Sequence, residues 1–524
     1  MLSRSFNVLP FLFATKQPQF RPILNLDQVP QAAPLDTTTT IHSSGLITST
    51  IEEHSNIAES VQVTRLQNGV RIISQDLGGA IASIGAYTFA GPAFEPANCP
   101  GLGAMLQSAF TLQNSKQTTL NGKKIVNIEE FYPKVHKYHV SAHVNCSRDG
   151  WQSRKSSHRI AEEQAKMKSK SSSKKQNSIF GIITASLTNP PIQKAEVETL
   201  HNSSDTRLNE LRWKQPTEYA KLLLETVAYY LEPLGSPRFV PVENSPYITS
   251  AVLQEHHSLY AVSSRTIIAG VNVDHDALVE EYENASIPDS NPPSEPPNTL
   301  ESEEEVNLKT ETRQYTGGER HDHEDRAKVI ITKPFMDTET ICAVGWLTYG
   351  QDRVQLKQYA ASLVAKALLD LGLTNDRHHN TGDSCVGSGM NAFYTPFQTA
   401  GLLGFTLVSE PAQAPKMLLE AMKLVKGIKN APQEAVNIAK LNARVSFLNE
   451  NTVSIQDYCD FLCTCLPPIS DSRMVTGLDE VLLAIESVST TDIKCVIDMM
   501  LSHPTSFYGH GEMHRFPSIR HLGL

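Results

Sequence analysis

Residues 61–74 read Val61-Gln-Val-Thr-Arg-Leu-Gln-Asn-Gly-Val-Arg-Ile-Ile-Ser74. The Asn-Gly pair at 68–69 separates two runs in which apolar residues recur, which is the strongest short-range signal for a β-hairpin. We therefore predict strands at 61–66 and 70–74, joined by a turn at 67–69. A third strand is predicted at Ala82–Phe89, and a helix is predicted to begin after Pro100, because Gly91 and Pro92 break the chain between them.

The second part of the chain repeats this pattern of predicted strands followed by predicted helices. Strands are predicted at 328–332, 340–347 and 400–409, and helices at 355–371, 415–427 and 432–449. Strands followed by helices in both parts indicate an α+β fold class, with two similar halves in which an antiparallel-rich sheet packs against helices. We place the first half at 61–285 and the second at 313–524.

An acidic, Pro-rich linker is predicted between the halves, at 286–312. Residues 286–305 contain five prolines and six acidic residues but no Lys or Arg. Such a composition cannot bury enough apolar surface to offset the entropy lost on ordering. We expect a solvated tether.

The N-terminal region indicates targeting. Residues 1–26 carry three basic residues and no acid before Asp27, which is typical of a mitochondrial presequence. A disordered tail that happens to lack acids is the alternative. Residues 27–60, rich in Thr, Ser and Pro, are predicted to form an extended arm.

A basic insertion is predicted at about 147–178. It carries nine Lys or Arg residues against three acids, with many serines. A solvated loop insertion is the favoured interpretation. A docking arm for anionic lipid or an acidic partner is the alternative.

The bulk composition restricts the classes of partner. The 524 residues are 40% hydrophobic and 19% charged, with a formal net charge of -10, so nucleic acid is not an expected main partner. The sequence contains no run of about 18 apolar residues, so we predict no transmembrane helix and expect membrane association through partner subunits.

Of the eight cysteines, Cys459, Cys463 and Cys465 lie close together in an apolar, helix-like stretch. A metal cluster there lacks a fourth ligand, so we predict buried packing instead.

Short turn and strand motifs occur in order along both halves. They are Leu66-Gln-Asn-Gly-Val70, Gly91-Pro-Ala-Phe-Glu95, Gly101-Leu102, Pro233-Leu-Gly-Ser-Pro237, Ile267-Ile-Ala-Gly-Val-Asn-Val-Asp-His-Asp-Ala-Leu278, Tyr315-Thr-Gly-Gly-Glu319, Asn391-Ala-Phe-Tyr394 and Thr399-Ala-Gly-Leu-Leu-Gly-Phe405. Together they resemble the pitrilysin-type (M16) peptidases over about 60–285 and 313–520. The resemblance is greatest to the mitochondrial branch, which comprises the processing peptidase subunits and the core proteins of the cytochrome bc1 complex.

Active members of that family carry His-x-x-Glu-His on a helix. Two imidazoles one turn apart bind zinc, and the adjacent carboxylate takes a proton from the metal-bound water. The resemblance places these roles on Ala104, Gln107 and Ser108, none of which can perform them. The third ligand would fall near Glu196–Asp205. We therefore predict no catalytic residue, no cofactor and no metal.

Other histidine motifs offer no replacement. No histidine begins a His-x-x-Glu-His or His-Glu-x-x-His motif. His321–Asp325 is dense in donor groups but is predicted to be an exposed loop, as is His378-His379. His139 and His143 are predicted to share one face of a strand, without a carboxylate base between them.

The resemblance implies two functions. The first is a non-catalytic core subunit of ubiquinol–cytochrome c reductase (complex III), on the matrix side of the mitochondrial inner membrane. Its partners would be a second core or processing-peptidase-β-like subunit, cytochrome b, cytochrome c1 and the Rieske protein. The alternative is the non-catalytic α subunit of the processing peptidase, which binds presequence peptides. The α subunits carry a long glycine-rich loop, whereas residues 371–390 have only scattered glycines, so the core subunit is favoured.

Overall fold

The computed structural model describes residues 61–118, 134–148, 183, 186–187, 189–284, 315–323, 339–379, 389–398, 400–466, 476–513 and 516–521. All of them belong to one compact unit, residues 55–524. The predicted presequence, arm, linker and strand at 328–332 lie outside the described residues, as do residues 149–178 of the basic insertion.

The first sheet has five strands in the order β1-β2-β5-β3-β4. Strands β2 and β5 are parallel, and the other neighbours are antiparallel. The predicted hairpin is confirmed: Gln62 pairs with Ser74 and Arg65 with Arg71, and Gly69 takes the positive φ that the turn requires. The strands are β1 (Gln62–Arg65), β2 (Arg71–Gln75), β3 (Ile81–Thr88), β4 (Val140–Ser147) and β5 (Thr266–Val271).

The second sheet also has five strands, in the order β6-β10-β7-β9-β8. Strands β6 and β10 are parallel, and the other pairs are antiparallel. The order and directions of β2-β5-β3-β4 therefore recur as β6-β10-β7-β9. The strands are β6 (Gly318–His323), β7 (Thr340–Tyr349), β8 (Met390–Pro396), β9 (Ala400–Ser409) and β10 (Ser506–Gly511).

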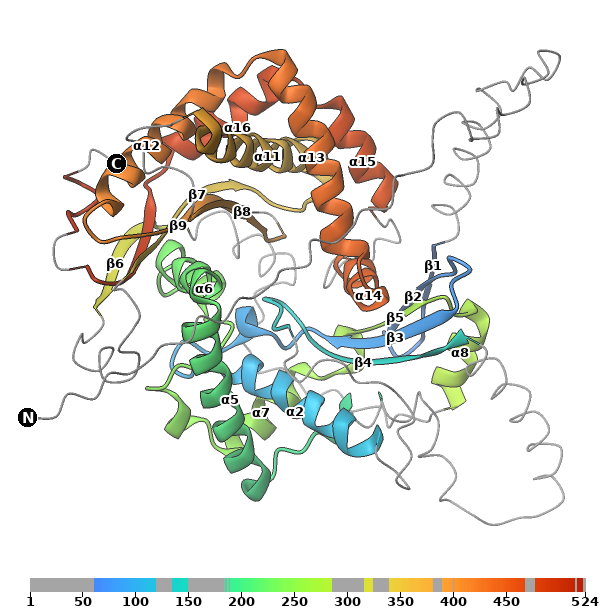
Figure 1. The fold of residues 1–524 in the computed structure, drawn as a ribbon. Helices are drawn as coiled ribbons and strands as arrows, with labels where there is room; N and C mark the ends of the chain where they lie inside the picture. Colours follow the sequence, from blue (N-terminus) through green and yellow to red (C-terminus); the bar gives the residue numbers. More distant parts are fainter. Residues whose placement is uncertain are drawn as a thin grey trace, which may run out of the picture. The chain divides into compact units, whose positions relative to one another are not determined.

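Helices cover both sheets (Figure 1). On the first sheet, Leu106 and Phe110 pack against Ile84 and Val144 in one apolar cluster. The helices of the first part are α2 (Leu102–Thr118), α5 (Lys194–Lys214), α6 (Pro216–Ala228), α7 (Ser250–Tyr260) and α8 (His275–Asn284). Those of the second part are α11 (Leu356–His379), α12 (Ala414–Gly427), α13 (Gln433–Thr452), α14 (Ile455–Thr464), α15 (Leu478–Ser487) and α16 (Thr490–Ser502). The chain is thus a mixture of α and β structure with two mixed sheets. This agrees with the mixture of strands and helices that the sequence predicted.

Two helices cross over between the two parts (Figure 1). Helix α6 packs on the second sheet, where Leu224 lies in one cluster with Ala343 and Tyr508. Helix α14 packs on the first sheet, where the thiol of Cys459 donates to the Ala269 carbonyl over 3.3 Å. Each sheet therefore completes its core with a helix from the other part of the chain.

The structure corrects three local predictions. The predicted exposed loop at 321–325 is wrong through His323, because these residues form β6 beside β10, and His321 contacts Glu319 at 2.6 Å. The helix predicted to end at 371 continues to His379, so His378-His379 lies in a helix. His143 lies in β4, but His139 precedes its first residue.

We expect Leu224→Ala to destabilise the second sheet, although Leu224 belongs to the first part. A Leu224 methyl group lies 3.0 Å from where a Cβ on Gly345 would stand, so the contact is tight. The cavity should cost about 2–5 kcal/mol of unfolding free energy, measured by urea denaturation. Leu441→Ala, at a helical position that is 61% exposed, is the control. Equal effects of the two substitutions would contradict this packing.

Candidate functional site

The three motif positions on α2 lie in a packed environment. Ala104 is buried in an apolar cluster with Val197 and Leu200 of α5. Gln107 is buried beside β4, and the Ser108 hydroxyl donates to the Ala104 carbonyl over 3.0 Å. These side chains therefore contribute to packing and to local hydrogen bonding.

Gln107 pairs with the backbone of the edge strand β4. Its Nε2 donates to the Ser141 carbonyl over 2.8 Å, and the Ser141 N–H donates to its Oε1, also over 2.8 Å. Both groups are buried, and the amide satisfies the donor and the acceptor together. A carboxylate at this position could accept but not donate.

The region expected to hold a third ligand faces α2 with mostly apolar groups. The Ser204 hydroxyl donates to the sulfur of Met105 over 3.7 Å. Glu196 serves in the capping box at the start of α5, and Asp205 is exposed. Neither acid takes part in the apolar cluster around Ala104.

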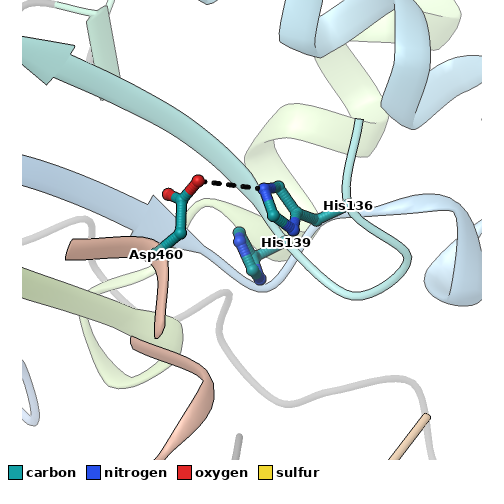
Figure 2. Close-up of side chains that lie close together, drawn as sticks. All are labelled: His136, His139 and Asp460. Carbon is teal, nitrogen blue, oxygen red and sulfur yellow. Dashed lines mark ion pairs between the residues drawn. The ribbon is translucent and has the colours of Figure 1, made fainter. Parts of the chain in front are cut away.

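A second set of polar side chains lies where α14 meets the segment before β4 (Figure 2). His136 Nε2 lies 3.3 Å from Asp460 Oδ2, and the rings of His136 and His139 stack with their centroids 4.3 Å apart. In the described part of the chain, these three residues are the one group of His, Cys, Asp or Glu side chains close enough to hold a metal ion.

Asp460 also has partners on the first sheet. The Tyr87 hydroxyl donates to Asp460 Oδ1 over 2.8 Å, and His143 Nε2 lies 3.1 Å from the same oxygen. Although burial opposes ionisation, His143 and His136 hold the pKa of Asp460 well below its usual range. Burial lowers the pKa of His139, which is therefore a neutral imidazole.

A cavity of about 390 Å³ opens beside this cluster. Both parts of the chain line it, with His136, His139 and Glu225 from the first and Tyr394 and Asp460 from the second. Its lining holds five acidic and five basic side chains, so their charges balance. The acids are Glu218, Glu225, Glu450, Asp457 and Asp460, and the bases are Lys134, Lys137, Lys221, Arg238 and Lys366.

A buried ion cluster fixes the segment before β4. Lys137 Nζ lies 3.2 Å from Glu225 of α6 and donates to the Ser236 carbonyl over 2.8 Å. Arg238 contacts the same carboxylate at 2.5 Å. Burial lowers the pKa of Lys137 to about 8, although Glu225 opposes the shift. His136 and His139 flank Lys137 and are positioned by these contacts.

Sequence reasoning considered His139 but discounted it, because no carboxylate base lies between it and His143, and it missed His136 and Asp460. Tyr87 and Asp460 are 373 residues apart, so no local spacing could have indicated their contact. The available signal was an acid inside an otherwise apolar helix, in the stretch Tyr458-Cys-Asp-Phe-Leu462. The three nearby cysteines are buried around it, as the packing interpretation predicted.

Replacing Gln107 tests the pairing with β4. We expect Gln107→Met to lower the unfolding free energy by about 1–3 kcal/mol for each Ser141 group that is left unpaired. Gln107→Glu should be more destabilising at pH 7.5 than at pH 5, because only a protonated carboxyl can donate to the Ser141 carbonyl. Urea denaturation measures both, and Ser108→Ala on the same helix is the control. A Gln107→Glu variant as stable as wild type at pH 7.5 would count against this role.

A pH test concerns Glu95, whose two carboxyl oxygens accept from the Gly101 and Gly103 N–H groups over 2.7 and 2.5 Å. Burial raises its pKa from 4.5 to about 8, although these hydrogen bonds oppose the shift. Its contribution to stability should therefore be fully present below pH 4.5 and be lost as the pH rises to about 8. Glu95→Gln should gain stability relative to wild type between pH 5 and 8 in denaturation series. A constant difference would exclude this linkage.

Comparison with known proteins gives partial matches. No family model matches the chain. It is 24% identical over 335 residues to the mitochondrial ubiquinol-cytochrome-c reductase complex core protein 2 of Euglena gracilis, which covers 64% of this chain and 66% of that protein. It is 24% identical over 220 residues to the mitochondrial-processing peptidase subunit alpha of Rattus norvegicus, covering 42% of this chain and 38% of that protein.

The same α subunit from Neurospora crassa is 21% identical over 222 residues, covering 42% of this chain and 34% of that protein. The match thus spans just under two thirds of the core protein and little more than a third of each peptidase subunit. These relatives confirm the resemblance that the sequence motifs indicated: the chain resembles the mitochondrial branch of the pitrilysin-type family, in its core proteins and its processing-peptidase α subunits.

Proposed function

We propose that this chain is a non-catalytic core subunit of mitochondrial ubiquinol–cytochrome c reductase, with a structural role on the matrix side of the inner membrane. The observation that carries the proposal is the extent of similarity: the match to core protein 2 runs over 335 residues, against 220 for the rat peptidase subunit. The proposed partners are a second core or β-like subunit, cytochrome b, cytochrome c1 and the Rieske protein.

The environment of α2 supports the absence of peptidase activity. A zinc peptidase needs two imidazoles and a general base at the three motif positions. Ala104 offers no donor atom, and the Gln107 amide is already engaged with both backbone groups of Ser141. The Ser108 hydroxyl donates within its own helix. The proposed role therefore rests on assembly rather than on chemistry at α2.

An arrangement of two M16-type halves forms part of this proposal, with halves at 61–285 and 313–524. The recurrence of β2-β5-β3-β4 as β6-β10-β7-β9 supports it, because a duplicated domain keeps its strand order. The reciprocal placement of α6 and α14 supports it as well. Each of these helices follows a long helix, α5 or α13, and covers the opposite sheet.

Attachment to the membrane is proposed to run through the partner subunits. Among the helices in the described residues, none has both the length and the apolar character needed to cross a bilayer. A subunit held by protein contacts would separate from the membrane when those contacts are broken. The proposed location is therefore a peripheral one on the complex.

The α subunit of the processing peptidase is the second candidate, and the similarity to rat and fungal α subunits favours it. Such a subunit would bind basic presequences, for which an acidic cavity is the expected complement. The cavity between the two parts has balanced charges instead. This balance favours the core subunit.

Native electrophoresis of digitonin-solubilised mitochondria distinguishes the two functions. We expect the chain to co-migrate with haems b and c1, because a core subunit remains bound to the complex. Immunodetection with haem staining measures this. Migration as a small heterodimer without haem would overturn the core subunit and support the peptidase subunit. A peptidase assay on the same bands, with a presequence peptide, shows whether the complex also carries processing activity through its partner.

A further inference from the structure

We propose that His136, His139 and Asp460 bind a zinc ion that joins α14 to the segment before β4. Two imidazoles and a carboxylate are a common protein ligand set for zinc. The site shares no residue with the three motif positions on α2, and it does not depend on the proposed function. It runs against the prediction from the sequence that the chain binds no metal, and one measurement decides between them.

The three donors lie close enough together to converge on one zinc ion. Their ligand atoms all lie within 4.8 Å of one another. The distance of 3.3 Å between His136 Nε2 and Asp460 Oδ2 matches the edge of a tetrahedral zinc site, about 3.3 Å for metal–ligand bonds of about 2.0–2.1 Å. Figure 2 shows the two imidazole rings side by side, with the Asp460 carboxylate facing them from another segment. Small side-chain rotations would complete the coordination.

His139 provides an independent indication. The residue is 3% exposed, and its Nε2 has no hydrogen-bond partner in the part of the chain that the structure describes. A buried ring nitrogen without a partner is costly, and such groups are rare in native proteins. A metal ion would use its lone pair.

The surroundings orient the carboxylate as a ligand requires. Tyr87 and His143 both contact Oδ1 of Asp460, and the other oxygen, Oδ2, faces His136. Hydrogen bonds to the second oxygen of a ligating carboxylate fix its orientation, and their loss weakens metal binding. The cluster therefore has both a ligand set and its outer support.

The fourth coordination position would face the cavity of about 390 Å³, which all three ligands line. Water or another small ligand can occupy that position. Because Asp460 comes from α14 and both histidines precede β4, the ion would hold the two parts of the chain together. We specify zinc over ferrous iron because nitrogen and oxygen sites bind Zn²⁺ more tightly than Fe²⁺.

The test is the metal content of the purified full-length chain after dialysis against metal-free buffer. Mass spectrometry should find about one zinc per chain, and removal by chelator followed by Co²⁺ should give the visible absorption of a low-symmetry site. Both readouts use wild-type protein, so they do not depend on whether any variant folds. A chain without stoichiometric zinc that gives no such Co²⁺ spectrum, or one that holds iron instead, would overturn the proposal.

The zinc content of substituted proteins tests whether the ion is bound at this site. His139→Gln and Asp460→Asn should lose zinc, and Tyr87→Phe should weaken zinc binding about 10–100-fold through its loss of support for Asp460. His256→Gln is the matched control, since His256 is a buried histidine whose Nε2 contacts the Ala90 carbonyl at 3.1 Å. It should keep full zinc content. Zinc retained by His139→Gln and Asp460→Asn would place the ion elsewhere and refute this site.

Discussion

The exchange of helices between the two parts of the chain is the constraint on which the rest of the structure depends. The face of each sheet carries apolar side chains that its own strands cannot cover. Helix α14 covers Tyr87 and Ala269 of the first sheet, and α6 covers Ala343 of the second. Removing either helix would expose a sheet face to water, with a cost that scales with the apolar area. The exchange also brings together the polar residues that line the cavity.

Buried charges are placed where this exchange occurs. Glu225 on α6 holds Lys137 and Arg238, and Asp460 on α14 contacts Tyr87 and His136. A buried ion pair contributes little net stability, but breaking one is costly, because the remaining charge is left unpaired. The contacts of Asp460 therefore define the angle and register at which α14 meets the first part, whereas Glu225 ties α6 to the segment before β4 within its own part. Apolar packing alone would specify that register less strictly.

The sequence predicted elements with local signals and missed those that depend on distant partners. Asn68-Gly69 defined the first hairpin, and the strand at 400–409 and the helix at 415–427 lie within one residue of β9 and α12. Strand β6 was missed because Glu-Arg-His-Asp-His has no apolar alternation, and it becomes a strand by pairing with β10. Ala104, Gln107 and Ser108 could be assigned from the motif, but the contact of Gln107 with Ser141 could not. Asp460 was missed because only the tertiary fold brings it to the histidines.

The crossing of α14 has a consequence for the order in which the protein can fold. The first sheet is built from residues 62–271, but its cover spans residues 455–464. During synthesis, the early strands emerge long before that helix is available. The apolar face of the first sheet stays exposed until then. Contacts of such long sequence separation form slowly and leave intermediates prone to aggregation. The first sheet of this chain therefore keeps an uncovered apolar face until residues 455–464 have been made.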